Sequence, residues 1–191
     1  MTAVSLSRTL VTTLALTAAG TAYAHTGDHA LLGFMSGWSH PWMGLDHLLA
    51  MLAVGLWAAQ QGGRALWAVP LTFVAAMVVG GALAGFGIVL PFVETGIALS
   101  VLVLGLLLVW QQRLPLAAGM GIVGVFALFH GFAHGLEMPL AVSPVLYALG
   151  FVLATSLLHG IGVLAGSYSK PALRIAGAAT ALNGATLLLA S

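Results

Sequence analysis

The chain has 191 residues, of which 61% are hydrophobic and only 5% are charged, and its formal net charge is +1. Its mean hydropathy is +1.11. A soluble domain carries about 25% charged residues, so this composition excludes an ordinary water-soluble protein and indicates an integral membrane protein. The chain has no basic patch for nucleic acid, and without cysteine it has no disulfide, thiolate metal site or cysteine nucleophile.

The N-terminal segment has the pattern of a cleavable signal peptide. Arg8 closes a short basic region, residues 9–19 form an apolar core, and residues 22–24 (Ala-Tyr-Ala) fit a small-x-small cleavage site. The core is shorter than the roughly 20 residues that a bilayer requires. We therefore expect a signal peptide at 1–24 and a transmembrane domain at 25–191, with an uncleaved anchor helix as the alternative.

Six apolar segments follow, each close to the length that crosses a bilayer. Joints rich in Gly, Pro and Gln separate them, and none shows the alternating polarity of a β-barrel strand. The sequence therefore predicts an all-α, polytopic membrane bundle of six transmembrane helices. The predicted helices lie at approximately 41–60, 66–86, 93–111, 116–135, 145–166 and 172–190.

The charged residues predict the orientation of this bundle. The basic residues of the mature chain all lie at the first, third and fifth joints: Arg64, Arg113, Lys170 and Arg174. The acidic residues outside the first helix lie on the opposite side: Asp28, Glu94 and Glu137. By the positive-inside rule, both termini are expected outside the cytoplasm. For a bacterial inner (cytoplasmic) membrane, the N-terminus is then periplasmic.

The first predicted helix opens with the sequence HPWMGLDH, in which His40, Asp46 and His47 fall within eight residues. A charged side chain in hydrocarbon costs about 2.5–3.5 kcal/mol on insertion scales, so it is kept only when paired, hydrated or bound. On a single helix, the seven-residue spacing places both imidazoles on one side. Met43 and Met51 would share that stripe, as packing residues rather than soft ligands. Asp46 would bind an ion or orient an imidazole.

The fourth and fifth predicted helices carry further ligand types. Spacings of four and three residues place His130, His134 and Glu137 within a narrow arc if the helix persists that far. His130 and His134 are expected at the same depth as His47. His159 is expected about 21 Å below the outer end of its helix, in the inner half of the membrane. The inner-half candidates of the fifth helix are Thr155, Ser156 and His159.

Signal-peptide cleavage would expose a mature N-terminus that begins His-Thr-Gly-Asp-His. His25, Asp28 and His29 could then offer ligands at the outer face, although a solvated polar tail explains them equally well. Imidazole and carboxylate without thiolate suit nickel, cobalt or zinc. The chain has no GxxxxGK[ST] sequence, so a transporter built from it would not bind ATP through such a loop.

The pattern HPxxGxDH followed by Leu-Leu-Ala-Met, with a later HGxxHGxE run and a preceding signal peptide, resembles the HupE/UreJ family over essentially the whole mature chain. The resemblance implies a small membrane permease for nickel, in some members cobalt, that serves hydrogenase or urease maturation. It also implies that His40, Asp46 and His47 are essential for transport. His130, His134 and Glu137 would be the second functional motif, and the preference for nickel rests on the resemblance alone.

We expect a secondary, relay-type permease. His25, Asp28 and His29 would capture the ion, and the first and fourth helices would hold it in the outer half. Thr155, Ser156 and His159 would then pass it toward the cytoplasm, because several moderate sites favour conduction. The expected partners are Ni²⁺ or Co²⁺ as cargo, the lipid bilayer, maturation proteins that receive the metal and, as one option, a second copy in a homo-oligomer. No permanently bound cofactor and no nucleic acid are expected.

Two other readings use the same residues. An intramembrane zinc-dependent hydrolase would need three converging ligands and a general base, for which Glu137 or Asp46 could serve. The expected spread of the histidines over depth and the lack of a further acid or base in the membrane weigh against it. Haem held between His130 and His159 would need ligands at matching depth, and these two are expected to be mismatched.

Overall fold

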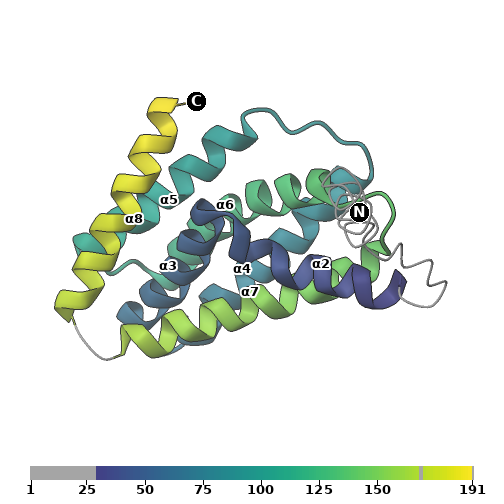
Figure 1. Cartoon of the computed structure of the whole chain (residues 1–191). Helices are drawn as coiled ribbons and strands as arrows, with labels where there is room; N and C mark the ends of the chain where they lie inside the picture. The colour runs from purple at the N-terminus through teal and green to yellow at the C-terminus, as the bar shows by residue number, and fades with distance from the viewer. Residues whose placement is uncertain (1–28, 168–169, 191) are drawn as a thin grey trace, which may run out of the picture.

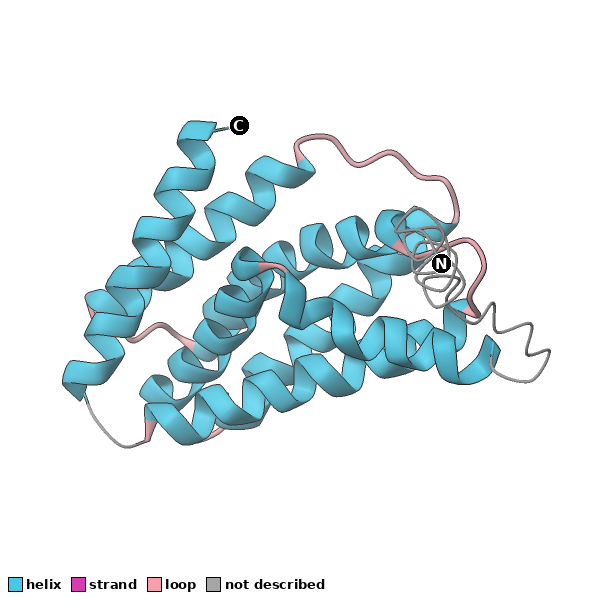
Figure 2. Cartoon of the chain, viewed as in Figure 1, coloured by secondary structure: helices cyan, strands magenta, loops and turns pink. Residues whose placement is uncertain are grey.

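The computed structural model describes residues 29–167 and 170–190. Within these residues every regular element is an α-helix, which confirms the all-α prediction. The predicted signal peptide, His25 and Asp28 lie outside the described residues. The helices are α2 (His29–Met43), α3 (Leu45–Gln61), α4 (Ala65–Gly85), α5 (Val93–Val109), α6 (Leu116–Glu137), α7 (Pro144–Gly166) and α8 (Lys170–Ala190), drawn in Figures 1 and 2.

Several of these helices are membrane-span candidates. Four are long and apolar enough to cross a bilayer: α4, α6, α7 and residues Leu173–Ala190 of α8. The bent pair α2–α3 counts as a fifth if it forms one span, whereas α5 is a shorter apolar helix. The chain is therefore a multi-pass helical membrane protein with four to five span candidates by this measure, and the count of six crossings stays a prediction.

The first predicted helix, 41–60, is wrong at its N-terminal end. Residues 29–43 already form α2, Pro41 lies inside that helix, and α3 starts only at Leu45. The two helices meet at an angle of 83°. Gly44 between them is extended, with φ −96° and ψ 120°. Pro41 weakens the last turn of α2, because a proline inside a helix removes a backbone donor and crowds the preceding turn. A poor helix former at Gly44 then ends it.

The break at Gly44 also overturns the predicted methionine stripe. Met43, at the end of α2, is 83% exposed, whereas Met51 on α3 is completely buried. The two side chains therefore do not lie on one helix face. Of these two methionines only Met51 enters the core, so the expectation of a packing role applies to Met51 and not to Met43.

Helix α7 packs against α2 along its first half and against α3 along its second half (Figure 1). Close backbone approach at two glycines permits this: Gly37 lies against the backbone of Tyr147, and Gly55 lies against Gly162. Small residues allow helices to pack closely where lipid provides no hydrophobic driving force between them. Both α2 and α3 therefore run in the same direction as α7.

The remaining helices form two further pairs, α4 with α6 and α5 with α8. In the first pair Gly124 lies beside Thr72 and Gly135 lies beside Ala84, so α4 and α6 are parallel. In the second pair the numbering runs in opposite directions, since Gly105 meets Ala181. A second contact, between Gly184 and Leu102, confirms that α5 and α8 are antiparallel.

Candidate metal site

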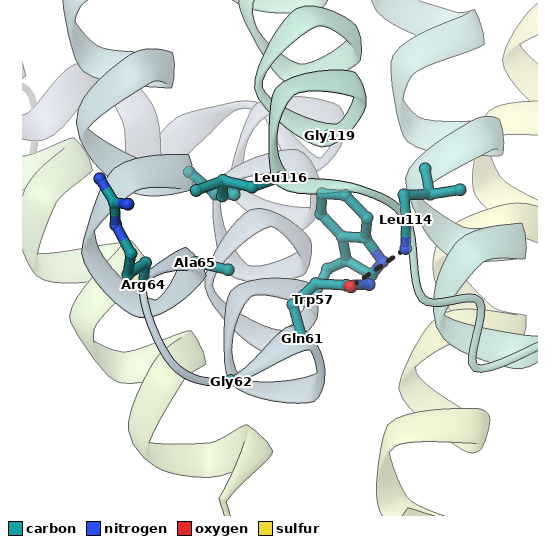
Figure 3. A pocket seen from close by; sticks show the side chains of 9 residues that line it. Trp57, Gln61, Gly62, Arg64, Ala65, Leu114, Leu116 and Gly119 are labelled. Atoms are coloured by element: carbon teal, nitrogen blue, oxygen red, sulfur yellow. Dashed lines mark hydrogen bonds between the residues drawn. The ribbon is translucent and has the colours of Figure 1, made fainter.

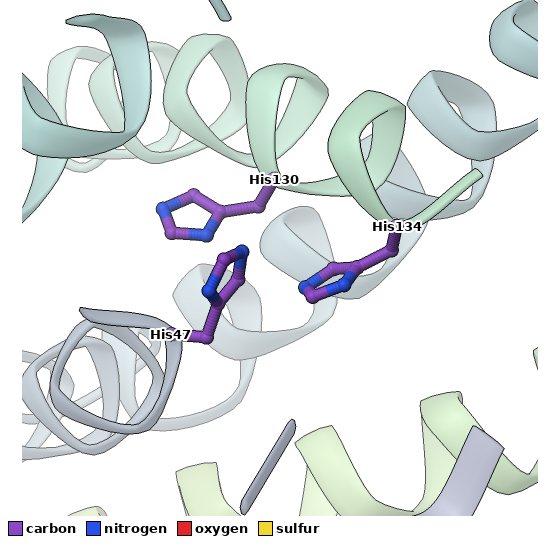
Figure 4. A group of neighbouring side chains, drawn as sticks. All are labelled: His47, His130 and His134. Carbon is purple, nitrogen blue, oxygen red and sulfur yellow. The ribbon is translucent and has the colours of Figure 1, made fainter. Parts of the chain in front are cut away.

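Three histidines converge in the interior between α3 and α6. One ligand nitrogen from each of His47, His130 and His134 lies within 4.8 Å of the others (Figure 4). The ring centroid of His47 is 4.9 Å from that of His130 and 4.2 Å from that of His134. All three side chains are buried. Two come from one face of α6, as their four-residue spacing predicts, and the third comes from the first turn of α3.

A second group of ligand atoms lies beside the first and shares one histidine with it. His40, His134 and Glu137 also offer ligand atoms within 4.8 Å of one another. Nε2 of His40 is 2.9 Å from Oε2 of Glu137, and Nδ1 of His134 is 3.5 Å from the same oxygen. This group is more open, since the side chains of His40 and Glu137 are 28% and 51% exposed.

The predicted relation between His40 and His47 is wrong in its geometry. They lie on two helices on either side of the Gly44 break, not on one face of a single helix. Both nevertheless contact His134, with ring centroids at 4.7 Å for His40 and 4.2 Å for His47. Because α2 and α3 pack mainly on α7 and α6 packs mainly on α4, the two predicted motifs meet through their side chains, and helical periodicity within the first motif does not bring them together.

Asp46 supports His47 and does not belong to either three-residue group. Its Oδ1 lies 3.0 Å from Nδ1 of His47. A carboxylate can only accept, so Nδ1–H of His47 donates to it and Nε2 keeps the lone pair. Nε2 is buried and has no hydrogen-bond partner among the described residues. Of the two roles predicted for Asp46, the geometry favours orienting an imidazole.

Ser100 has the corresponding position beside His130, and the sequence analysis did not identify it. The completely buried Ser100 hydroxyl donates to the Ile97 carbonyl at 2.6 Å. Its oxygen lies 2.7 Å from Nε2 of His130, and since its hydrogen is already used, it accepts from Nε2–H. The lone pair of His130 is then on Nδ1, which is buried without a partner among the described residues. The only signal in the sequence is a serine inside an apolar segment.

Aromatic side chains of α7 form one wall of the site and were also missed. The Phe151 ring lies 4.2 Å from the His134 ring, and the Tyr147 ring lies 5.9 Å from that of His40. The Tyr147 hydroxyl is buried and has no hydrogen-bond partner among the described residues. These rings shield one side of the histidine groups from their surroundings.

The predicted inner-half group is divided by the fold. Nδ1–H of the buried His159 donates to the Met51 carbonyl at 2.8 Å. The Thr155 hydroxyl lies 3.4 Å from the sulfur of Met51 and 3.9 Å from that of Met77. Ser156 is instead exposed, and it lines a groove of about 560 Å³ between α4 and α7 that also reaches His159. Ser156 is therefore wrongly grouped with the buried Thr155.

The Phe73 ring packs between His159 of the predicted inner-half group and His130 of the histidine cluster. This fully buried ring packs edge-on against His159, with centroids 5.0 Å apart, and tilts over His130 at 5.7 Å. His159 is accordingly absent from both three-residue groups. The N-terminal His25 lies outside the described residues. His29 begins α2, but its side chain is not among those described.

A cavity of about 310 Å³ lies at the opposite end of α3 from His47 (Figure 3). The Gln61 side chain donates to the Gln112 carbonyl at 2.6 Å and accepts from the Leu114 amide at 3.2 Å. Trp57 also donates to the Gln112 carbonyl, at 3.3 Å. Arg64 lines the cavity, and its positive charge makes this end unsuitable for holding a cation. These contacts fix the end of α3 to the connection between α5 and α6.

The chemistry of the cluster suits a divalent cation. Three neutral imidazoles, one of them backed by a carboxylate, are ligands for nickel, cobalt, zinc and copper(II). The convergence of His47, His130 and His134 also removes one argument against a hydrolase, because these three are not spread over depth. Ligand identity alone therefore leaves both transport and hydrolysis chemically feasible.

Comparison with known proteins adds independent information. A family model described as HupE / UreJ protein matches residues 13–187. The chain is similar to Protein HupE of Rhizobium leguminosarum bv. viciae, with 46% identity over 188 residues that cover 96% of this chain and 98% of that protein. No solved structure matches the chain.

Proposed function

Because the chain belongs to the HupE/UreJ family, we propose that it is a secondary permease that moves nickel, or cobalt, across the cytoplasmic membrane for hydrogenase or urease maturation. The observation that carries this proposal is the buried convergence of His47, His130 and His134 inside a helical membrane bundle. A buried cluster of three imidazoles with lone pairs that no described residue engages is costly unless a ligand uses them.

We further propose six crossings after a cleaved signal peptide, with both termini outside. The directions of the packed pairs support this count, because alternating crossings require α3 parallel to α7, α4 parallel to α6, and α5 antiparallel to α8. The cavity at the end of α3 adds support, since Arg64 of the first joint and Leu114 of the third line it together. The first and third joints thus lie together at the far end of α3 from His47, in agreement with the positive-inside rule.

The proposed inner half of the route is formed by Thr155, the two methionine sulfurs beside it and His159. Nε2 of His159 is buried and has no hydrogen-bond partner among the described residues, so it can accept a passing cation. These neutral donors lack the carboxylates of the outer half and would hold a divalent ion more weakly. The ion would therefore pass from a stronger binding position to a weaker one, and a weaker last position favours its release toward the cytoplasm.

The hydrolase alternative is less well supported by the carboxylates. A zinc hydrolase needs a general base able to reach the metal-bound water. Asp46 is engaged by Nδ1 of His47 at 3.0 Å, and Glu137 is engaged by Nε2 of His40 at 2.9 Å. Both candidate bases therefore already accept hydrogen bonds from imidazoles, which is the arrangement of groups that position ligands.

The test is metal uptake into proteoliposomes that contain only the purified protein, with a Ni²⁺ gradient and no nucleotide. We expect uptake by the wild type, reduced uptake by His130→Ala, and wild-type uptake by Thr180→Ala. Thr180 is a suitable control because its buried hydroxyl contacts only the Ala176 carbonyl of its own helix, at 2.8 Å, among the bonds that the structure describes. Tight Ni²⁺ binding without flux by the wild type would contradict the permease proposal.

A further inference from the structure

The two ligand groups of the outer half have His134 in common. The outer group consists of His40, His134 and Glu137, and the buried group consists of His47, His130 and His134. The imidazole of His134 contacts both His40 and His47, with ring centroids 4.7 and 4.2 Å away. A single side chain therefore completes both groups, and neither group reaches three ligands without it.

A neutral imidazole has one nitrogen that can accept, since the other carries a proton. His134 can therefore bind one cation at a time unless it loses its second proton as well. We propose that the two groups are alternative positions for a single divalent cation, which passes from the outer to the buried position by exchange on His134. This inference deepens the proposed permease function and rests on it for the direction of movement.

The surroundings of the two groups give each position a different task. Glu137 is 51% exposed and offers a carboxylate oxygen directly, so the outer position can accept an ion that still keeps part of its water. His130 is completely buried and His134 is 4% exposed, so the buried position requires that this water be removed. Three imidazoles replace the lost water there.

Each position also has one negative charge to offset the ion. At the outer position the charge is that of Glu137, which is itself a ligand candidate. At the buried position it is that of Asp46, which acts through the imidazole of His47. Since unlike charges attract more strongly in a medium of low dielectric constant, a divalent ion would be stabilised at both positions without a second carboxylate in the core. Movement of the ion from the outer to the buried position therefore leaves it near one carboxylate in both places.

The sharing of His134 predicts the stoichiometry and the mutant pattern of Ni²⁺ binding. The experiment is titration of the purified full-length protein with Ni²⁺ in detergent at fixed pH. A His25→Ala/His29→Ala background keeps the N-terminal imidazoles from adding a site. We expect one Ni²⁺ per chain. His40→Ala and His130→Ala should each still bind one ion, because each leaves one group intact.

His134→Ala should weaken binding by at least 10–100-fold, and by more than either of the other two substitutions. The His40→Ala/His130→Ala double variant should lose a similar amount of Ni²⁺ affinity to His134→Ala, because it also breaks both groups. X-ray absorption of the Ni²⁺ complexes gives a second readout: in His130→Ala the ion should gain an oxygen ligand and lose one imidazole relative to the wild type. Glutamine in place of each alanine keeps side-chain volume and tests whether a loss of binding reflects misfolding.

Two bound Ni²⁺ ions per chain in the His25→Ala/His29→Ala background would overturn the sharing of His134, and so would a His134→Ala variant that binds no more weakly than His40→Ala. Neither result depends on transport. A stoichiometry of one without uptake into proteoliposomes would overturn the permease proposal and leave the shared ligand intact. A stoichiometry of two with uptake would do the reverse.

Discussion

The hydroxyl oxygen of Ser100 lies 2.7 Å from Nε2 of His130, and both side chains are completely buried where α5 meets α6. Because the serine hydrogen is directed to the Ile97 carbonyl, this contact holds a proton on Nε2 and leaves Nδ1 toward the other histidines. The hydrogen bond thus determines which nitrogen of His130 is available to a cation, without placing a charged group in the core.

Replacing Ser100 should therefore weaken metal binding. We expect Ser100→Ala to lower Ni²⁺ affinity by about 10–100-fold, as the loss of a group that orients a ligand typically does. Titration calorimetry in detergent measures the change. Ser100→Thr retains a hydroxyl and should recover part of the affinity, whereas Thr180→Ala removes a buried hydroxyl remote from any imidazole contact and should have no effect. Equal losses in Ser100→Ala and Thr180→Ala would mean that a general packing defect is responsible.

Asp46→Asn should abolish Ni²⁺ uptake and leave membrane insertion intact. An asparagine has nearly the same size and still offers an oxygen to Nδ1 of His47, but it removes the charge that offsets a divalent ion in a low-dielectric environment. Proteoliposome uptake measures transport, and protease protection of the reconstituted protein measures insertion. Uptake at the wild-type rate would show that Asp46 has only a structural role.

The substitutions His47→Ala and His134→Ala should be non-additive. Each removes a ligand of the buried group and should weaken Ni²⁺ binding, and His134→Ala, which also breaks the outer group, should show the larger loss, at least about 10–100-fold. The double variant should lose clearly less than the sum of the two losses in free energy, because residues that share a partner couple. All four proteins must be titrated at one pH, since a protonated imidazole cannot bind metal. Full additivity would indicate that α3 and α6 hold separate ions.

Gly55→Ala should destabilise the bundle. A methyl group at this position would overlap the His159 carbonyl and the Gly162 backbone of α7, so the helices would have to move apart. Such overpacking costs about 1–3 kcal/mol. Gly121→Ala is the matched control, because a methyl group there meets nothing within 4 Å and alanine favours a helix. Thermal unfolding in detergent should give a lower transition temperature for Gly55→Ala and an unchanged or higher one for Gly121→Ala.

The mature protein isolated from its native membrane should begin at His25. The small-x-small site after a short apolar core predicts cleavage after Ala24. Intact-mass measurement gives the N-terminus directly. A chain that retains Met1 would refute cleavage and add one hydrophobic segment to the membrane domain.

Apolar runs and their breakers were sufficient to predict α4 to α8 to within a few residues, because each of these helices is long, continuous and bounded by Gly, Pro or charged residues. The relation of His130 to His134 followed from helical periodicity. Residues 29–47 were not predicted correctly, because the predicted helix at 41–60 begins at Pro41, whereas α2 contains Pro41 and ends at Met43. The extent of α2 is determined by its packing against α7. A contact between two helices cannot be predicted from the hydrophobic periodicity of one segment.

The partners of the histidines were only partly predictable. Asp46 adjoins His47 in the sequence, so its role as a supporting group could be considered from the outset. Ser100 and Phe151 approach the site from other helices, and no local pattern distinguishes them from residues that pack against lipid or the core. Such contacts depend on which helices become neighbours. Because the helices of this chain are all apolar and similar in composition, the sequence does not indicate which of them pack together.

The one-residue interruption at Gly44 also places two helix ends at the metal site. The last turn of α2 has backbone carbonyls without partners in a following turn, and these carry the partial negative charge of a helix C-terminus, roughly half an elementary charge. His40 lies in that turn. The first turn of α3 carries the opposite partial charge, and Asp46 lies there. The Asp46 carboxylate therefore lies at the helix end that stabilises a negative charge, and His40 lies at the end that favours a bound cation, an arrangement that an uninterrupted helix through residues 29–61 would lack.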